Sequence, residues 1–130
     1  MEDLIERMSS LPLEEKKILY NEIARLIRQD MMDKKEKEEE EMQRMKLLLF
    51  DILGFVDYIP SSRERKQVVF RIILSNLFLR MGRIEAEVGC VIQKDHSTIH
   101  HYRRMLEMWL SQPRYFEEEL SYWNQINALI

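Results

Sequence analysis

Two helical segments meet in the sequence VGCVIQKDHSTIHHYRR, residues 88–104. Asp95 stands where the second helix is expected to begin, because an aspartate at an N-cap can accept the backbone N–H of Ser97 or Thr98. Ser97 is a competing cap for the same helix. The two residues before Asp95 form the turn. The pattern predicts a short helix, a tight turn and a longer second helix.

The second helix is expected to have an apolar side and a polar side. At about 100° per residue, its apolar arc holds Ile99, Tyr102, Leu106, Trp109 and Leu110. The opposite arc holds Ser97, His100, His101, Arg104 and Met108. The two adjacent histidines therefore face outward, either on a plain solvated surface or on a binding surface.

Two helices joined by a tight turn, with a polar and basic outer face on the second, form the arrangement of a DNA-reading helix-turn-helix. Gly89 fits the position at which such helices need a small residue in order to approach each other. Ile92 and Ile99 can seal the angle between them. Gln93 is a departure, since many of these turns use glycine there for a positive φ angle.

The same run resembles the C-terminal duplex-DNA-binding domain of the bacterial replication initiator DnaA, whose signature reads approximately I-G-x-x-F-G-x-R-D-H-[ST]-T-V-x-H-A. The matching positions are Val88, Gly89, Asp95, His96, Ser97, Thr98, Ile99 and His101, and Lys94 replaces an arginine. With the preceding helix, the resemblance covers residues 63–110. It implies base contacts from Asp95, His96 and Ser97 in the major groove and a phosphate contact from Thr98.

A basic loop assists DNA binding in that family, and three residues of this chain occupy a comparable place without matching it residue by residue. The expected DNA-binding set is therefore Lys94, Asp95, His96, Ser97, Thr98, His101 and Arg104, together with Arg63, Arg65 and Lys66 from the loop. The resemblance implies sequence-specific binding to duplex DNA and a role in replication or regulation.

The chain also departs from the DnaA pattern. Its turn is one residue shorter and lacks the family's glycines, and Tyr102 replaces a small residue, so the angle of the recognition helix is expected to differ. No G-x-x-x-x-G-K-[ST] motif occurs, and glycine stands only at positions 54, 82 and 89, which excludes a phosphate-cradling loop. The resemblance is to the DNA-binding module without its ATPase, as in phage or mobile-element proteins.

Composition places this motif in an all-α protein. The 130 residues include only three glycines and three prolines, while 45% are hydrophobic and 33% charged, which favours a small soluble helical domain with an extension. The net charge is −3, but residues 60–110 carry nine Lys and Arg against five Asp and Glu. The segment with the motif is therefore basic between acidic flanks.

We expect residues 1–59 to form a helical extension and residues 60–130 to form the helix-turn-helix domain with a C-terminal helix. After a short amphipathic start at Leu4, Ile5 and Met8, apolar residues recur at helical spacing over 18–31 and 42–53. The run DKKEKEEEE, residues 33–41, separates them and has no apolar residue. It is interpreted as a solvated helix, with a flexible hinge or an acidic partner-binding arm as alternatives.

The apolar ends of this extension are expected to pack on the C-terminal domain or on a second copy, which would make a homodimer. Within the domain, the pattern predicts a helix over 68–78 that stops near Gly82 and a short helix from Ile84 to Ile92 that includes Val91. After Pro113 it predicts a last helix that packs through Tyr115, Phe116, Leu120, Trp123 and Ile126.

Other chemistries fit the sequence less well. His96 and His100 have metal-ligand spacing, but no cysteine pair or further histidine completes a tetrahedral set, so we expect no metal and no other cofactor. A nucleophilic enzyme built on Ser97 or Cys90 would need a pocket that a small helical chain rarely offers. We expect a cytoplasmic, non-enzymatic protein with no membrane or small-molecule partner. The alternative is a helical protein-interaction module that retains the fold without binding DNA.

Overall fold

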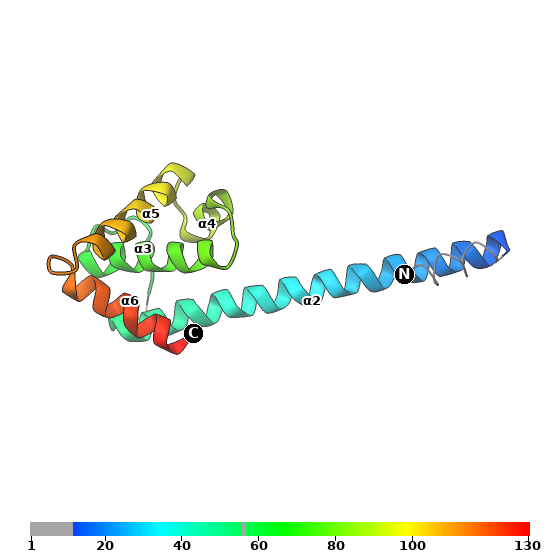
Figure 1. Cartoon of the computed structure of the whole chain (residues 1–130), viewed down its shortest axis with the longest axis horizontal. Helices are drawn as coiled ribbons and strands as arrows, with labels where there is room; N and C mark the ends of the chain where they lie inside the picture. The colour runs from blue at the N-terminus through cyan, green and yellow to red at the C-terminus, as the bar shows by residue number, and fades with distance from the viewer. Residues whose placement is uncertain (1–11, 56) are drawn as a thin grey trace. The chain divides into compact units, whose positions relative to one another are not determined.

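The computed structural model describes residues 12–55 and 57–130. Over these residues the chain is all-α, as the sequence predicts. The helices are α2 (Leu13–Leu53), α3 (Arg65–Arg80), α4 (Glu85–Ile92), α5 (His96–Ser111) and α6 (Glu117–Leu129) (Figure 1). The amphipathic start at Leu4, Ile5 and Met8 lies outside the described residues.

The chain divides into two compact units, residues 1–40 and 41–130, and α2 passes from the first into the second. This boundary differs from the expected division at residues 59 and 60. The reason is that Met45, Leu49 and Leu53, on the last turns of α2, are buried in the core of the second unit. The prediction that this end of the long helix packs on the C-terminal domain is confirmed.

The charged run over residues 33–41 is helical throughout and lies within the continuous α2. Residues 33–40 are all exposed, in agreement with a solvated helix and not with a break between two helices. Two short-range ion pairs form along α2, one before the run and one that includes its last residue. Arg25 lies 3.3 Å from Glu22 and Arg44 lies 2.8 Å from Glu41, each three residues away on the same helix face.

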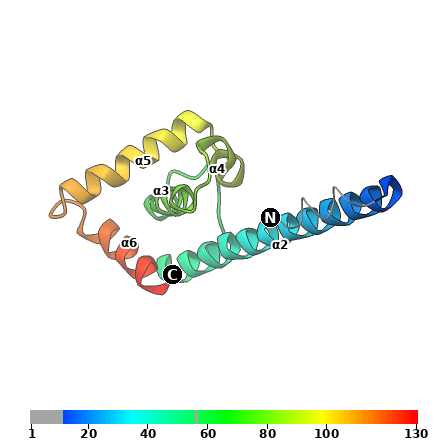
Figure 2. The same cartoon turned by 45° about the vertical axis from the view of Figure 1, so that its right-hand side comes forward.

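The second unit is built around α3. Residues 71–78 of this helix are all buried, because α3 is covered on several sides. Figure 2 views α3 nearly end-on and shows α4, α5 and α6 arranged around it. The core cluster includes Phe70, Ile73, Leu77, Val88, Ile92, Ile99, Trp109, Trp123 and Ile126. Removing these side chains from water is the main force that holds the four helices together.

Residues 57–64, which precede α3, are fastened to that helix by the buried side chain of Arg71. Its guanidinium donates hydrogen bonds to the carbonyl of Ile59 (2.7 Å), the carbonyl of Ser62 and the hydroxyl of Tyr58 (3.2 Å). These acceptors satisfy a charge that would otherwise be costly to bury.

Two further side chains complete this attachment. Gln67 is buried, donates to the carbonyl of Asp57 (2.9 Å) and accepts the backbone N–H of Ile59 (3.0 Å). The hydroxyl of Tyr58 donates to the carbonyl of Ile92 at the end of α4 (2.5 Å), and burial raises the pKa of this phenol. The segment before α3 is therefore tied to both α3 and α4.

Gly82 ends α3, as the sequence predicts. It has a φ of +92°, its N–H donates to the carbonyl of Leu79 (3.0 Å), and the N–H of Arg83 donates to the carbonyl of Phe78 (3.2 Å). This pair of bonds is the Schellman arrangement, which satisfies the last carbonyls of a helix.

Leu110 and Tyr115, which the sequence predicts to pack, are exposed instead. Ile84 and Val91, which mark the predicted short helix, are exposed as well. Ile84 precedes the first turn of α4, and Val91 lies on the outer side of that eight-residue helix. Leu110 is at the edge of the apolar arc in the last turn of α5. Tyr115 is in the turn before α6 and not in the helix, because its N–H donates to the carbonyl of Gln112 (3.1 Å).

Candidate nucleic-acid interface

The turn between α4 and α5 consists of residues 93–95 and depends on close backbone contact. A Cβ atom at Gly89 would lie 2.6 Å from the carbonyl oxygen of Lys94, so no larger residue fits without moving the turn. The N–H of Lys94 in turn donates to the carbonyl of Gly89 (2.9 Å). The expectation that Gly89 must be small is confirmed.

Gln93 adopts a left-handed backbone conformation. Many helix-turn-helix proteins place a glycine at this position of the turn for that reason. The φ of Gln93 is 61° and its ψ is 47°, and within the described residues it is the only residue other than glycine with a positive φ. A side chain in this conformation costs about 1–2 kcal/mol relative to the right-handed region. The turn is therefore kept at a local energetic cost.

Asp95 is the N-cap residue of α5, as predicted, but its side chain makes no capping hydrogen bond. The predicted bond from the backbone N–H of Ser97 or Thr98 to this carboxylate is wrong. The carboxylate instead accepts the hydroxyl of Ser97 (3.3 Å) and lies 3.1 Å from Nδ1 of His96. A nearby hydroxyl and imidazole compete with the backbone for the same oxygens. The Asp95 carboxylate therefore contacts its two neighbouring side chains and not the backbone of α5.

The inner side of α5 fixes the helix to the core. Ile99, Tyr102, Leu106 and Trp109 are buried, which confirms most of the predicted apolar arc. Asn76 of α3 donates a hydrogen bond to the carbonyl of Tyr102 (3.2 Å). The bulk of Tyr102 is thus accommodated inside the unit, and the angle of α5 is set by packing along four turns.

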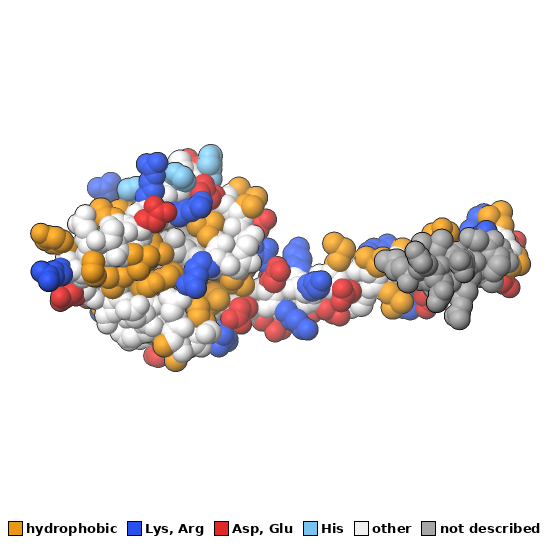
Figure 3. All heavy atoms as spheres, viewed as in Figure 1, with side chains coloured by type: hydrophobic (Ala, Val, Ile, Leu, Met, Phe, Trp, Pro, Cys, Tyr) orange, Lys and Arg blue, Asp and Glu red, His pale blue; other side chains and the backbone are white. Residues whose placement is uncertain are grey.

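The outer side of α5 presents polar and basic groups to solvent. His96, Ser97, His101 and Arg104 are exposed, while Thr98 is partly buried and Lys94, in the turn, is also partly buried. Figure 3 shows histidine side chains beside Lys and Arg side chains on this part of the surface, with acidic side chains among them. Arg104 makes no ion pair with any residue that the structure describes.

Glu85, from the first turn of α4, lies within this basic surface. Its carboxylate is 3.1 Å from Nδ1 of His100 and 3.5 Å from Nη1 of Arg103. The sequence gives no sign of a role for Glu85 or Arg103, because nothing in their spacing along the chain shows that α4 and α5 bring them together. The surface is therefore basic but not free of carboxylates.

Of the three basic residues expected in the loop, only Arg63 precedes α3, because Arg65 and Lys66 are the first two residues of that helix. Arg65 forms ion pairs with Glu118 (3.2 Å) and Glu119 of α6, and the hydrogen bond to Glu119 raises the pKa of Arg65. Arg63 and Lys66 are exposed and form no ion pair among the described residues. Arg65 is thus engaged in the attachment of α6, which sequence reasoning did not detect.

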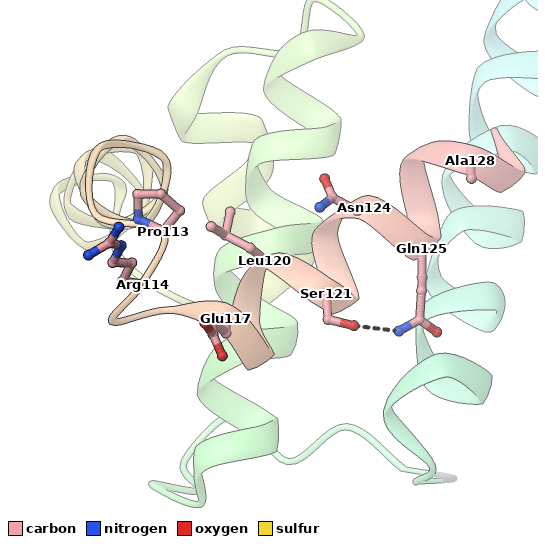
Figure 4. Close-up of a pocket in the computed structure, with 8 residues that line it drawn as sticks. All are labelled: Pro113, Arg114, Glu117, Leu120, Ser121, Asn124, Gln125 and Ala128. Atoms are coloured by element: carbon pink, nitrogen blue, oxygen red, sulfur yellow. Dashed lines mark hydrogen bonds between the residues drawn. The ribbon is translucent and has the colours of Figure 1, made fainter.

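Other features of the second unit offer less chemistry. A shallow groove runs along the outer side of α6, where Ser121 and Gln125 are hydrogen-bonded to each other (3.1 Å) and Arg114 and Glu117 lie near one end (Figure 4). Over residues 12–55 and 57–130, no three His, Cys, Asp or Glu side chains are grouped so as to hold a metal ion. In the same part of the chain, every helix is too short or too polar to span a membrane.

Comparisons with known proteins do not assign the chain to a family. No protein-family model, no curated protein and no solved structure matches it.

Proposed function

We propose that the second unit, residues 41–130, binds duplex DNA and that α5 is the recognition helix of a DnaA-like helix-turn-helix. One observation carries the proposal: the tight turn at Gly89 leaves the outer side of α5 exposed from its first residue, with His96, Ser97, His101 and Arg104 along it. An α-helix with side chains is about 10–12 Å wide, which matches the major groove of about 12 Å.

The side chains on this surface divide by chemistry. His96 and Ser97, at the N-terminus of α5, carry donors and acceptors that suit base edges, and each has an atom within 3.3 Å of the Asp95 carboxylate. Arg104, further along the helix and without an ion pair among the described residues, suits a phosphate. Thr98 and the backbone at the start of α5 suit a second phosphate, since helix N-termini attract anions.

The experiment that tests this proposal is a fluorescence-anisotropy titration of a labelled duplex at increasing salt. We expect affinity to fall as salt rises, with a slope of log Kd on log salt near 0.9 for each phosphate contacted. Arg104→Ala should weaken binding to all duplexes and lower the slope by about 1, whereas His96→Ala should reduce the preference among sequences. Arg114→Ala is the matched control, because Arg114 is exposed in the turn before α6.

A second candidate function is protein binding by the same fold. It is favoured by the carboxylate of Glu85, which engages His100 and Arg103 and reduces the positive charge available to phosphates. If the wild-type chain binds no duplex even at low salt, the DNA proposal fails and the interaction module becomes the better account. A role in phage or mobile-element replication or regulation remains part of the DNA proposal and is supported by the DnaA resemblance.

A further inference from the structure

The part of α2 in the first unit carries an apolar stripe along one side. At about 100° per residue, the stripe contains Leu13, Leu19, Tyr20, Ile23, Leu26, Ile27 and Met31, within an arc of about 140°. Two charged residues, Lys16 and Asp30, lie within the same arc near the two ends of the stripe. Leu13, Tyr20, Leu26, Ile27 and Met31 are between 56% and 69% exposed. The stripe runs for about 28 Å at 1.5 Å per residue.

A helix of this kind needs a partner. Most of the stability of a helix in water comes from the packing of its apolar side and not from intrinsic propensity. Within the described residues of the first unit, α2 is the only element, so no other described helix of that unit covers the stripe. Exposed contiguous apolar surface of this length marks an interaction surface.

The spacing and charge of α2 identify a second copy of this chain as the partner. Leu19, Ile23 and Leu26 are separated by four and then three residues, which is the spacing of the core positions through which two helices coil around each other, and Leu13, Tyr20 and Ile27 recur every seven residues beside them. Residues 14–30 hold four acidic and four basic side chains. A surface with balanced charge suits its own copy, whereas a surface adapted to a charged partner would show an excess of one sign.

The apolar area of the stripe is close to the area that a dimer interface needs. A fully buried aliphatic side chain removes on the order of 100 Å² from water. The seven stripe residues, two of them already half-buried, therefore supply roughly 500–700 Å² per copy, near the value of about 800 Å² per partner in stable interfaces. We propose that the chain forms a homodimer through residues 13–31 of α2. Pairing ends there because residues 33–41 have no apolar side chain and six acidic residues against three basic ones.

The test is the mass of the full chain in solution, without DNA, so that the result does not depend on the proposed function. Sedimentation equilibrium from about 1 µM to about 100 µM covers dissociation constants in that range. We expect twice the chain mass of 15.9 kDa. Ile27→Glu should weaken dimerisation at least about 100-fold, because each copy loses one buried side chain and gains a charge at the interface.

Ile18→Glu is the matched control. Ile18 is as exposed as the stripe residues, at 66%, but lies roughly 150° around the helix from the centre of the stripe. It should leave the dimer intact, and circular dichroism should show equal helix content in both variants. A chain that stays monomeric at the highest concentration, as it would if another segment of the same chain covered the stripe, overturns the proposal. Equal loss of the dimer in both variants overturns it as well.

Discussion

Replacing Gly89 by alanine should force α4 and α5 apart, and the structure allows the cost to be worked out. The new Cβ would lie 2.6 Å from the carbonyl oxygen of Lys94 and 3.6 Å from the nitrogen of His96, whereas ordinary contacts begin at 3.4 Å. The offending atom is backbone and is held by the hydrogen bond from Lys94 N–H to Gly89. The turn must therefore move by several tenths of an ångström or more.

Overpacking of this kind costs about 1–3 kcal/mol. About 1 kcal/mol of this loss in stability is offset, because alanine favours the helical conformation more than glycine does. We expect Gly89→Ala to lower the free energy of unfolding by up to about 2 kcal/mol. It should also weaken DNA binding by more than its effect on the folded fraction, since the start of α5 is displaced.

Urea denaturation followed by tryptophan fluorescence measures the first effect, because Trp109 and Trp123 are both buried in the second unit. Cys90→Ala, at the exposed neighbouring position of α4, is the control and should change the free energy of unfolding by less than about 0.5 kcal/mol. If Gly89→Ala is as stable as the wild type and binds DNA equally well, the close approach at this turn is not present and the reasoning is refuted.

Three further substitutions test other parts of the molecule. Gln93→Gly should raise the free energy of unfolding by about 0.5–1 kcal/mol in urea denaturation, because relief of the left-handed strain exceeds the entropy that glycine adds to the unfolded chain. A lower free energy of unfolding would contradict the positive φ of Gln93. Tyr58→Phe should lower the free energy of unfolding by about 1 kcal/mol in the same assay, since the carbonyl of Ile92 loses its donor, and an unchanged value would argue against this bond. Glu85→Gln should tighten DNA binding about 3–5-fold in the anisotropy titration, because a negative charge beside His100 is removed, and weaker binding would count against the proposed surface.

The sequence alone predicts those features of the second unit that depend on neighbouring residues. The start of α5 at Asp95, the small residue at Gly89 and the buried positions Ile99 and Tyr102 follow from helix periodicity and turn chemistry, and the structure confirms them. These features concern residues within about two turns of each other. Local pattern is sufficient there because local geometry determines the outcome.

Features that join distant parts of the chain could not be predicted in this way. The ion pair of Arg65 with Glu119 spans 54 residues, and the position of Glu119 depends on how α6 packs. Arg71 lies in an otherwise apolar run, VVFRIIL, which signals burial, but its acceptors in the 57–64 segment are set by the tertiary fold. The wrong prediction of a capping hydrogen bond at Asp95 has another cause. Several nearby donors compete for its carboxylate, and the sequence does not show which of them forms the hydrogen bond.

The most direct test of the account is selection of bound duplexes from a random pool by the full-length chain, repeated with His96→Ala. We expect the wild type to enrich one preferred site and the variant to enrich a site with relaxed preference at one or more base pairs, because His96 at the start of α5 is proposed to contact base edges. If the wild type enriches no sequence, or if both proteins enrich the same site with the same preference, then α5 does not read DNA through His96 and the proposal of sequence-specific DNA binding by this helix fails.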